Sequence, residues 1–414
     1  MIKYIIYLLT SLSLFAQTTG KISGLIKDKS DSAPLPGANV YLENTSFGSA
    51  SDESGRFTLI NIPPGKYNLK IDMIGYKSMK MENISVSVNR TFSLEAELEQ
   101  TVIEGEVVTV EVARFSQKKD QTGTIKNISG DEINALPVEN VGAVVNMQAG
   151  VVNGHFRGGR NTEVTYMVDG IQVDETFGGS SATVDIQPEA VQDLEVVTGT
   201  FNAEYGRAMS GVVNVVTRDG GPKFEGSVSL GGSSYYTDNT DIFVGLDPSI
   251  NTSQDIKFSL GGPVIGDKVT FFSNVRVQTN NGHLNGLRLF EVDNFSNFYS
   301  DDSTTWFSEK TGDSSYVSMN SSNNLSALFK LSFNLFNGIR FSTLYSYSND
   351  SWQGYDHSFK YNPDGRSTDH KVTNYFAFQL NQMFSQKLFY ELKYSVVDND
   401  YGSYVYENPL DRRY

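Results

Sequence analysis

The second half of the chain alternates apolar and polar residues with a period of two. Seven runs carry large apolar or aromatic side chains at alternate positions: 224–230, 256–260, 269–277, 325–335, 339–347, 376–384 and 388–396. The positions in between are mostly polar, for example Lys257, Arg276 and Lys393. Because successive side chains of a strand point to opposite faces, this pattern predicts seven strands, each with one apolar and one polar face.

The connections between these runs alternate between short and long. Residues 266–267, 337–338 and 385–386 form tight connections, and Asn337-Gly338 is the dipeptide most typical of a two-residue hairpin. The connections at 231–255, 279–324 and 348–371 are long. Short turns on one side and long loops on the other are typical of a bacterial transmembrane β-barrel. A soluble β-sandwich is the alternative, although it has no reason to alternate its loop lengths.

The number of strands also bears on the length of the chain. Bacterial barrels of this class have even strand counts, and a barrel that encloses a domain needs many more than eight strands. Seven strands therefore predict an incomplete barrel, and we expect the chain to be the N-terminal portion of a longer protein. A stop codon directly after Tyr414 in the gene would contradict this expectation.

Residues 114–221 predict a glycine-rich α+β domain. Short helices are expected at 129–133 and 139–145, and strands at 194–197 and 212–217. Asp169-Gly170 lies between two alternating runs, where this dipeptide favours a type I′ turn and hence a hairpin.

The same region resembles the plug domain of TonB-dependent outer-membrane receptors. The resemblance rests on spaced blocks, which are Phe156-Arg157-Gly158-Gly159-Arg160, Val168-Asp169-Gly170, residues 193–199, Ala203-Glu204-Tyr205-Gly206-Arg207 and residues 211–217. Residues 164–167 stand where glycan-importing receptors commonly carry Pro-Leu-Tyr or Pro-Leu-Phe, so the sequence looks closer to the Oar-like receptors.

A run of β-branched residues, with acidic residues just before it, precedes this region. The resemblance implies that it is the TonB box, the strand recruited by the energy-transducing TonB complex in the periplasm, formed by Glu106, Val107, Val108, Thr109 and Val110. A strand in this position can pair with the sheet edge of another protein. From the residues alone, the first strand of the following domain is an equally good interpretation.

Residues 20–99 predict a small β-sandwich. Short strands are expected at 21–26, 38–42, 56–60, 67–71 and 91–94, with turns at Pro36-Gly37 and Pro64-Gly65. The segments 34–40, 52–57 and 63–67 resemble the carboxypeptidase regulatory-like domain. That resemblance implies a transthyretin-like β-sandwich without catalytic residues.

The first residues predict export. An apolar run at 4–15 follows Lys3, and it is too short to span a bilayer but typical of a signal peptide. We expect cleavage after Ala16. The predicted order is a signal peptide (1–16), the sandwich (17–100), the plug (101–221) and the first seven strands of an antiparallel transmembrane β-barrel (222–414), so the fold is mainly β.

Composition excludes several classes of function. The net charge of -15 argues against nucleic acid as a partner, because binding phosphates requires clustered Lys and Arg. The chain has no cysteine, which excludes disulfides, thiolate metal sites and cysteine nucleophiles. Of its 50 aromatic residues, 35 follow residue 222, which marks a change of character at the start of the predicted barrel.

Candidate chemistry is sparse. The four histidines form no metal-binding pair at helical spacing, and no catalytic arrangement or cofactor motif is visible, so we expect no enzyme activity, no metal and no cofactor. Aspartates 301, 302, 398 and 400 offer oxygen ligands for calcium, although acidic loop residues are usually only solvated. We expect Arg157, Arg160, Glu204 and Arg207 to form ion pairs between plug and barrel.

Together with these patterns, the resemblance implies a TonB-dependent receptor of the cell outer membrane that imports a scarce nutrient, with its N-terminal domain in the periplasm. The expected partners are the TonB complex, outer-membrane lipid and an unknown small ligand or oligomer. The alternative is a surface adhesion or matrix-anchoring protein that has the same architecture and does not transport.

Overall fold

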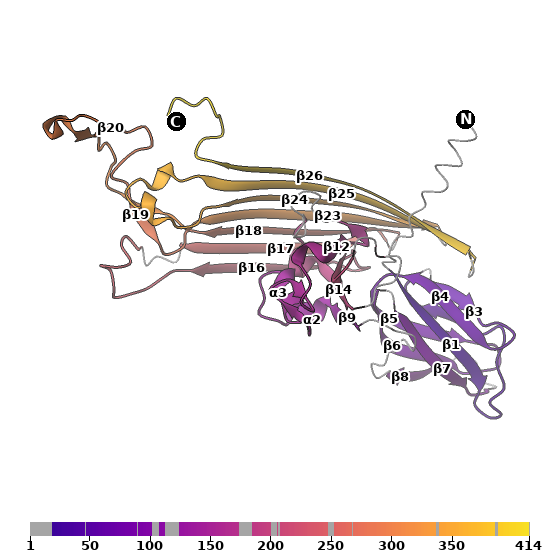
Figure 1. The fold of residues 1–414 in the computed structure, drawn as a ribbon. Helices are drawn as coiled ribbons and strands as arrows, with labels where there is room; N and C mark the ends of the chain where they lie inside the picture. Colours follow the sequence, from indigo (N-terminus) through magenta and orange to yellow (C-terminus); the bar gives the residue numbers. More distant parts are fainter. Residues whose placement is uncertain are drawn as a thin grey trace, which may run out of the picture.

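The computed structural model describes residues 19–45, 47–88, 90–101, 107–111, 124–173, 184–199, 205, 208–246, 252–266, 268–336, 339–385 and 388–413. The predicted signal peptide lies outside these residues. In chain order, Figure 1 shows a β-sandwich, a smaller mixed domain and a long curved sheet whose strands run side by side. No helix in the described part of the chain is long and apolar enough to cross a membrane.

The sandwich has two sheets around one apolar core. The smaller sheet has the order β4-β1-β7, with bounds Arg56–Ile62, Gly20–Asp28 and Thr91–Leu98. The larger has the order β3-β2-β5-β6-β8, with bounds Gly48–Ala50, Asn39–Leu42, Gly65–Asp72, Ser78–Val86 and Val107–Glu111. Buried side chains from both sheets, such as Ile22, Phe57 and Ile71, fill the space between them. All five predicted strands are present, and β3 and β6 are additional.

The mixed domain is built on a five-stranded sheet. Its order is β13-β12-β15-β14-β9, with bounds Ile171–Gln172, Val164–Val168, Gly211–Thr217, Val191–Thr198 and Thr124–Ser129. The two predicted helices are confirmed as α2 (Gly130–Asn134) and α3 (Val141–Asn146), which begin after the N-cap residues Ser129 and Asn140. Shorter elements are β10 (Val151–Val152), β11 (His155–Phe156), η1 (Asn161–Glu163) and η2 (Pro188–Ala190).

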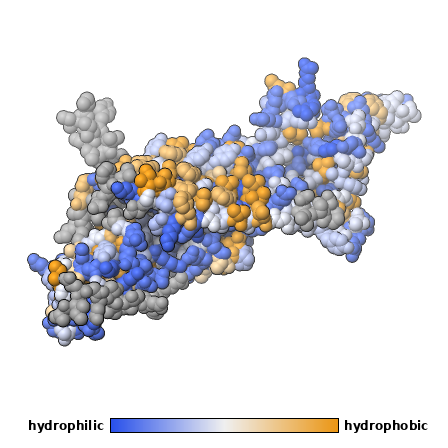
Figure 2. Space-filling view, turned by 180° about the vertical axis from the view of Figure 1, so that it is seen from behind, coloured by the Kyte–Doolittle hydropathy of each residue, from blue (hydrophilic) through white to orange (hydrophobic). Residues whose placement is uncertain are grey.

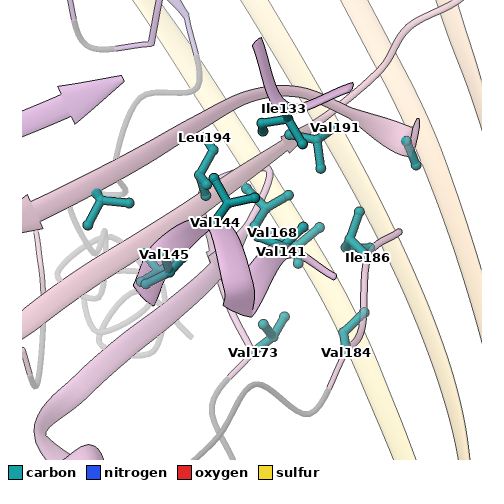
Figure 3. Packing of buried hydrophobic residues seen from close by; sticks show 14 of the residues in the cluster. Ile133, Val141, Val144, Val145, Val168, Val173, Val184, Ile186, Val191 and Leu194 are labelled. Atoms are coloured by element: carbon teal, nitrogen blue, oxygen red, sulfur yellow. The ribbon is translucent and has the colours of Figure 1, made fainter. Parts of the chain in front are cut away.

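Apolar side chains form the core of this domain between the helices and the sheet. Ile133 of α2 and Val144 of α3 are fully buried, as is Leu194 of β14. Figure 3 shows these side chains gathered around Val141, Val168 and Val191. The predicted turn is also confirmed, because Asp169 (φ 49°) and Gly170 (φ 69°) both have positive φ and Val168 pairs with Ile171 across the turn.

The long sheet contains the seven predicted strands in chain order, all antiparallel. They are β16 (Glu225–Ser233), β17 (Ser253–Ile265), β18 (Val269–Asn280), β23 (Ser322–Phe336), β24 (Ile339–Trp352), β25 (Thr368–Ser385) and β26 (Leu388–Tyr404). The connections alternate in length as predicted, although Asn337 and Gly338 themselves lie outside the described residues. The long connections hold β19 (Asn285–Leu287), β20 (Ser296–Asn297), η3 (Ser303–Thr305), β21 (Phe307–Ser308), β22 (Tyr316–Ser318), η4 (His357–Phe359) and η5 (Pro363–Gly365).

The two faces of this sheet are the reverse of those in a soluble protein. Most predicted apolar positions are exposed, including Phe258, Phe329 and Leu392, and Figure 2 shows hydrophobic residues gathered over the middle of the molecule, where the strands run. Many of the polar positions in between are buried, with Arg276 only 5% and Lys330 5% exposed, whereas β16 is exposed on both faces. Val269 is the exception, since it was predicted outside and is buried. An apolar outer face and a polar inner face are what a membrane-spanning sheet requires.

Candidate functional site: the plug contacts and the strand before the plug

The first plug block, residues 156–160, forms a compact turn beside strand β15. Phe156 is 1% exposed, and Arg157 and Gly158 both have positive φ. Gly159 lies so close to Ser210 that a Cβ on this glycine would be 2.4 Å from the Ser210 Cβ. The glycine at this position is therefore required by close packing of the turn against the segment that leads into β15.

The turn residue Asp169 makes a buried polar contact between the plug and the long sheet. Its carboxylate accepts hydrogen bonds from the Thr217 backbone N–H (2.8 Å) and the Thr217 Oγ1 (2.7 Å). Lys330 Nζ of β23 lies 3.1 Å from Asp169 Oδ2 and also donates to Thr217 Oγ1 at 2.8 Å. Both charged side chains are 6–7% exposed. A buried carboxylate of this kind needs its cation, because an unpaired buried charge is costly.

Asp219 extends this group of charges towards the first strand of the long sheet. It forms ion pairs with Lys330 (3.3 Å) and with the Arg340 guanidinium of β24, and it accepts a hydrogen bond from Ser332 Oγ at 2.6 Å. We call Asp169, Thr217, Asp219, Lys330 and Arg340 the Lys330 cluster. Two carboxylates of the chain preceding β16 are thus held by two cations of the sheet.

A second group of contacts holds the other side of the plug. Arg276 of β18 makes a bidentate pair with Asp255 at 2.8 and 2.9 Å, and its Nη1 donates to Gln187 Oε1 (2.9 Å) and the Glu139 carbonyl (3.0 Å). Lys257 of β17 pairs with Glu189 of η2 at 2.8 Å. The polar face of the sheet therefore binds the plug at two separate places.

Of the four residues that we expected to form these ion pairs, the two that the structure describes, Arg157 and Arg160, make other contacts. Arg157 Nη2 donates to Thr124 Oγ1 at 2.9 Å within the plug, and the Arg160 backbone N–H donates to Glu163. Tyr205 is buried against Met167 and Val212. Glu204, Gly206 and Arg207 lie outside the described residues. In the described part of the chain, the carboxylates of the ion pairs between plug and sheet belong to Asp169, Glu189 and Asp219. The lysine and arginine side chains that pair with them come from strands much later in the sequence.

The sandwich touches the plug at the edge strand β9. Asp193 of β14 is 3% exposed, and its carboxylate accepts hydrogen bonds from the Val88 backbone N–H (3.0 Å) and the Asn127 amide (3.2 Å). Arg90 Nη2 donates to the Ile125 carbonyl at 3.1 Å. Burial raises the pKa of Asp193 to about 6, against the lowering effect of these hydrogen bonds and of the Arg90 charge. We call this contact the β9 brace.

The strand before the plug belongs to the sandwich. The sequence had suggested either a TonB box between the two domains or the first strand of the plug. Four of the five candidate residues, Val107 to Val110, lie in β8, while Glu106 lies outside the described residues. β8 pairs in parallel with β6 of the sandwich, in the register Ser78 with Val107 through Glu82 with Glu111. It is therefore the edge strand of the sandwich's larger sheet, not a strand of the plug sheet.

Two protein families match the two N-terminal domains. Residues 22–110 match the CarboxypepD_reg-like domain, and residues 117–213 match the TonB-dependent Receptor Plug Domain. The first match ends at residue 110 and so includes most of β8. Both matches agree with the resemblances read from the sequence.

Relatives cover more of the chain. The chain is 27% identical to the TonB-dependent transporter Oar of Myxococcus xanthus over 71% of this chain and 30% of Oar, and 26% identical to the TonB-dependent receptor SusC of Bacteroides thetaiotaomicron over 54% of this chain and 23% of SusC. It thus spans 30% or less of the length of these curated relatives. The siderophore receptor PirA from Pseudomonas aeruginosa superimposes with a TM-score of 0.45 at 17% identity, over 68% of this chain and 42% of PirA.

The two domain matches agree with the observed order of a sandwich followed by the plug. The chain therefore carries a CarboxypepD_reg-like domain followed by the plug domain of a TonB-dependent outer-membrane receptor.

Proposed function

We propose that the chain works in the import of a scarce nutrient across the outer membrane, driven by TonB. The observation that carries this proposal is the inverted sheet, which covers the plug with its polar face and exposes its apolar face. Hydrogen bonds and ion pairs hold the plug on the inner face of the sheet. This arrangement suits a passage through the barrel that the plug closes at rest and that opens when TonB pulls on the plug.

In this proposal each part of the chain has a role. The long loops and the outer end of the plug capture a small ligand or oligomer. The periplasmic TonB complex recruits the strand at residues 106–110 and pulls on the plug, with energy from the proton gradient of the inner membrane. Outer-membrane lipid surrounds the apolar face. The chain has no catalytic role.

Deleting residues 106–110 in the full-length receptor tests this function. We expect the uptake of radiolabelled candidate nutrients by whole cells to be lost, while their binding to the cell surface is retained, because only the connection to TonB is removed. Cells without TonB are the matched control and should show the same loss. Unchanged uptake in the deletion variant would reject the assignment of the strand. Surface binding without any TonB-dependent uptake would instead favour adhesion.

A further inference from the structure

The connection between β18 and β23 carries a hairpin that stands away from the long strands. The hairpin consists of β20 and β21, which pair in antiparallel register. Figure 1 shows β20 beyond the ends of the long strands, at the end of the molecule opposite the sandwich. We call residues 291–309 the aromatic hairpin.

The base of the aromatic hairpin is fixed by the next long connection of the sheet. Arg288 pairs with Asp364 of that connection, through Nε at 2.5 Å and Nη2 at 3.2 Å. The backbone N–H groups of Leu289 and Phe290 both donate to the Tyr361 carbonyl, at 3.1 and 2.9 Å. Two long connections therefore hold the segment from which the hairpin leaves.

The tip of the hairpin is ordered by its own contacts. Trp306 Nε1 donates to the Ser300 carbonyl at 2.8 Å, and the Trp306 ring lies edge-on to the Phe298 ring with 5.9 Å between the ring centroids. Oδ1 of Asp302 accepts hydrogen bonds from the Thr304 backbone N–H (3.0 Å) and Oγ1 (2.6 Å), which caps the short helix η3. A tip ordered in this way loses little conformational freedom when it binds a partner.

The same tip exposes aromatic rings to solvent. Tyr299 is 97% exposed, Phe298 55% and Trp306 49%. Because the hairpin lies beyond the strands, these rings are not part of the apolar face of the sheet. Exposed apolar side chains that gather in one place mark a surface for interaction with a partner.

The charges around these rings are all negative. Residues 289–309 contain five acidic residues and no Lys or Arg. Asp301 and Asp302 lie in the tip, between the exposed tyrosine and the tryptophan, and both are exposed. Aromatic faces attract cations, and a guanidinium in particular stacks on a ring and pairs with a carboxylate. The tip therefore suits a cationic partner and repels anionic lipid.

The chain itself contains one example of this chemistry. The Arg413 guanidinium lies 3.8 Å from the centroid of the Tyr406 ring and 2.8 Å from the Asp411 carboxylate. A ring and a carboxylate thus hold one guanidinium together. The aromatic hairpin offers the same two groups with no cation of its own in the sequence of the tip.

We propose that the aromatic hairpin is a docking surface for an arginine-bearing peptide segment, whose guanidinium groups stack on the exposed rings and pair with Asp301 and Asp302. The proposal deepens the capture of a ligand by the long loops, and it rests on the proposed function only for the position of the hairpin outside the cell. The docking itself depends neither on TonB nor on transport.

Binding of fluorescein-labelled tetra-arginine to the full-length receptor in phosphatidylcholine nanodiscs, followed by fluorescence anisotropy, tests this surface. We expect Trp306→Ala to weaken binding about tenfold, because truncation of an aromatic residue in an interface removes a large share of its energy. Binding should also weaken as the salt concentration rises, since salt screens exposed charges. Tyr236→Ala, which removes an exposed ring in a different long connection, is the control and should bind like the parent.

A second variant tests the charges and leaves the rings in place. In Asp301→Asn/Asp302→Asn the asparagine oxygen can still cap η3, so the tip keeps its fold. We expect tetra-arginine to bind about fivefold more weakly, as the loss of an exposed ion pair allows, with a smaller dependence on salt. The matched control is Asp238→Asn/Asp241→Asn, which removes two exposed carboxylates from another long connection and should not weaken binding.

Three results would overturn the proposal. The first is no binding of tetra-arginine to the parent, and the second is binding that neither hairpin variant weakens, which would show general attraction to an acidic protein. The third is binding of the uncharged sugar maltoheptaose that is lost in Trp306→Ala and unchanged in Asp301→Asn/Asp302→Asn, which would assign the rings to a neutral glycan.

Labelling of a Tyr299→Cys variant with a membrane-impermeant maleimide separates this proposal from the proposed function. No labelling of the purified receptor would show that another segment covers the hairpin, and the docking surface would then be rejected. Labelling of the purified receptor but not of intact cells would reject the position of the hairpin outside the cell, while binding of tetra-arginine in nanodiscs would still support the surface. Labelling of both is the expected result.

Discussion

The Lys330 cluster gives the sharpest prediction about how the plug is held. Lys330 Nζ lies 3.1 Å from Asp169, 3.3 Å from Asp219 and 2.8 Å from Thr217 Oγ1. Replacing this lysine with methionine keeps the side-chain length and removes the charge. The Asp169 carboxylate then stays buried, with only its two hydrogen bonds from Thr217.

The size of the effect follows from burial. Asp169 and Lys330 have side chains that are 7% and 6% exposed, so water does not replace the missing cation. Removing one partner of such a buried pair costs about 3–5 kcal/mol. Some of this cost is recovered if the carboxylate is neutralised as well. Because asparagine tolerates positive φ, Asp169→Asn keeps the turn, and the double variant should be more stable than Lys330→Met alone.

Hydrogen exchange on the backbone amides of β12 and β15 measures this cost in the purified receptor. For Lys330→Met we expect protection to fall by roughly two to four orders of magnitude, which is the same energy divided by about 1.4 kcal/mol per tenfold change. Lys223→Met removes an exposed cation and is the control, with an expected change within about 0.5 kcal/mol. A loss of less than fivefold for Lys330→Met, or a double variant no better than the single one, would refute this account of the cluster.

Three further predictions concern the other contacts. Burial raises the pKa of Asp193 from 3.8 to about 6, so docking of the sandwich onto the plug takes up a proton, and the stabilisation from this proton is lost as the pH rises through 6. Docking should therefore tighten about tenfold from pH 7.5 to pH 5, measured by protease protection of the β9 brace. Asp193→Asn should abolish this pH dependence. Gly211→Ala should destabilise the plug by about 1–3 kcal/mol in chemical unfolding, because its Cβ would lie 2.3 Å from the buried Phe156 ring. Gly142→Ala, at an exposed position of α3, should have a smaller effect, because the one atom near its Cβ is the side-chain Oδ1 of Asn140 at 3.2 Å. Phe329→Arg on the outer face should lower the folding free energy in lipid by about 2–4 kcal/mol, and an equal yield of folded protein would contradict a lipid-facing position.

Period-two patterns and turn dipeptides were sufficient to predict the long sheet and the plug hairpin. Each of those signals is local, since the two faces of a strand and an Asp-Gly turn can both be recognised from consecutive residues. Strand β6 was missed because it lacks this local signal. Its residues mix Met, Glu and Asn without clean alternation, and Asn83 has a positive φ of 60° where the register with β5 shifts. A bulge of this kind breaks the alternation that sequence reading depends on.

The contacts between domains had no such local signal. Lys330 and Asp169 are separated by 161 positions, and the alternation could show only that Lys330 lies on the polar face. Arg157 and Arg160 were expected to form ion pairs with the sheet, whereas the carboxylate that pairs with Lys330 belongs to Asp169 in the turn between β12 and β13. The position of β8 was equally hidden, because a β-branched run says that a strand forms and not which edge it joins.

The chemistry of the plug contact suits a domain that has to move. The plug keeps its own core apolar, with Val144, Ile133 and Leu194 fully buried inside it, so it holds together when it shifts. Its contacts with the sheet combine ion pairs at Asp169, Glu189 and Asp219 with apolar contacts. The apolar contacts come from side chains of the long sheet that belong to the same buried cluster as the plug core, namely Phe272, Leu328, Leu344, Tyr375 and Ala377. Charges that separate into water are rehydrated, which offsets much of the attraction that is lost, whereas apolar surfaces that separate gain nothing in return. The ion pairs of this contact can therefore be opened at moderate cost, whereas the apolar part resists separation and helps to keep the plug seated in the closed state of the proposed transport cycle.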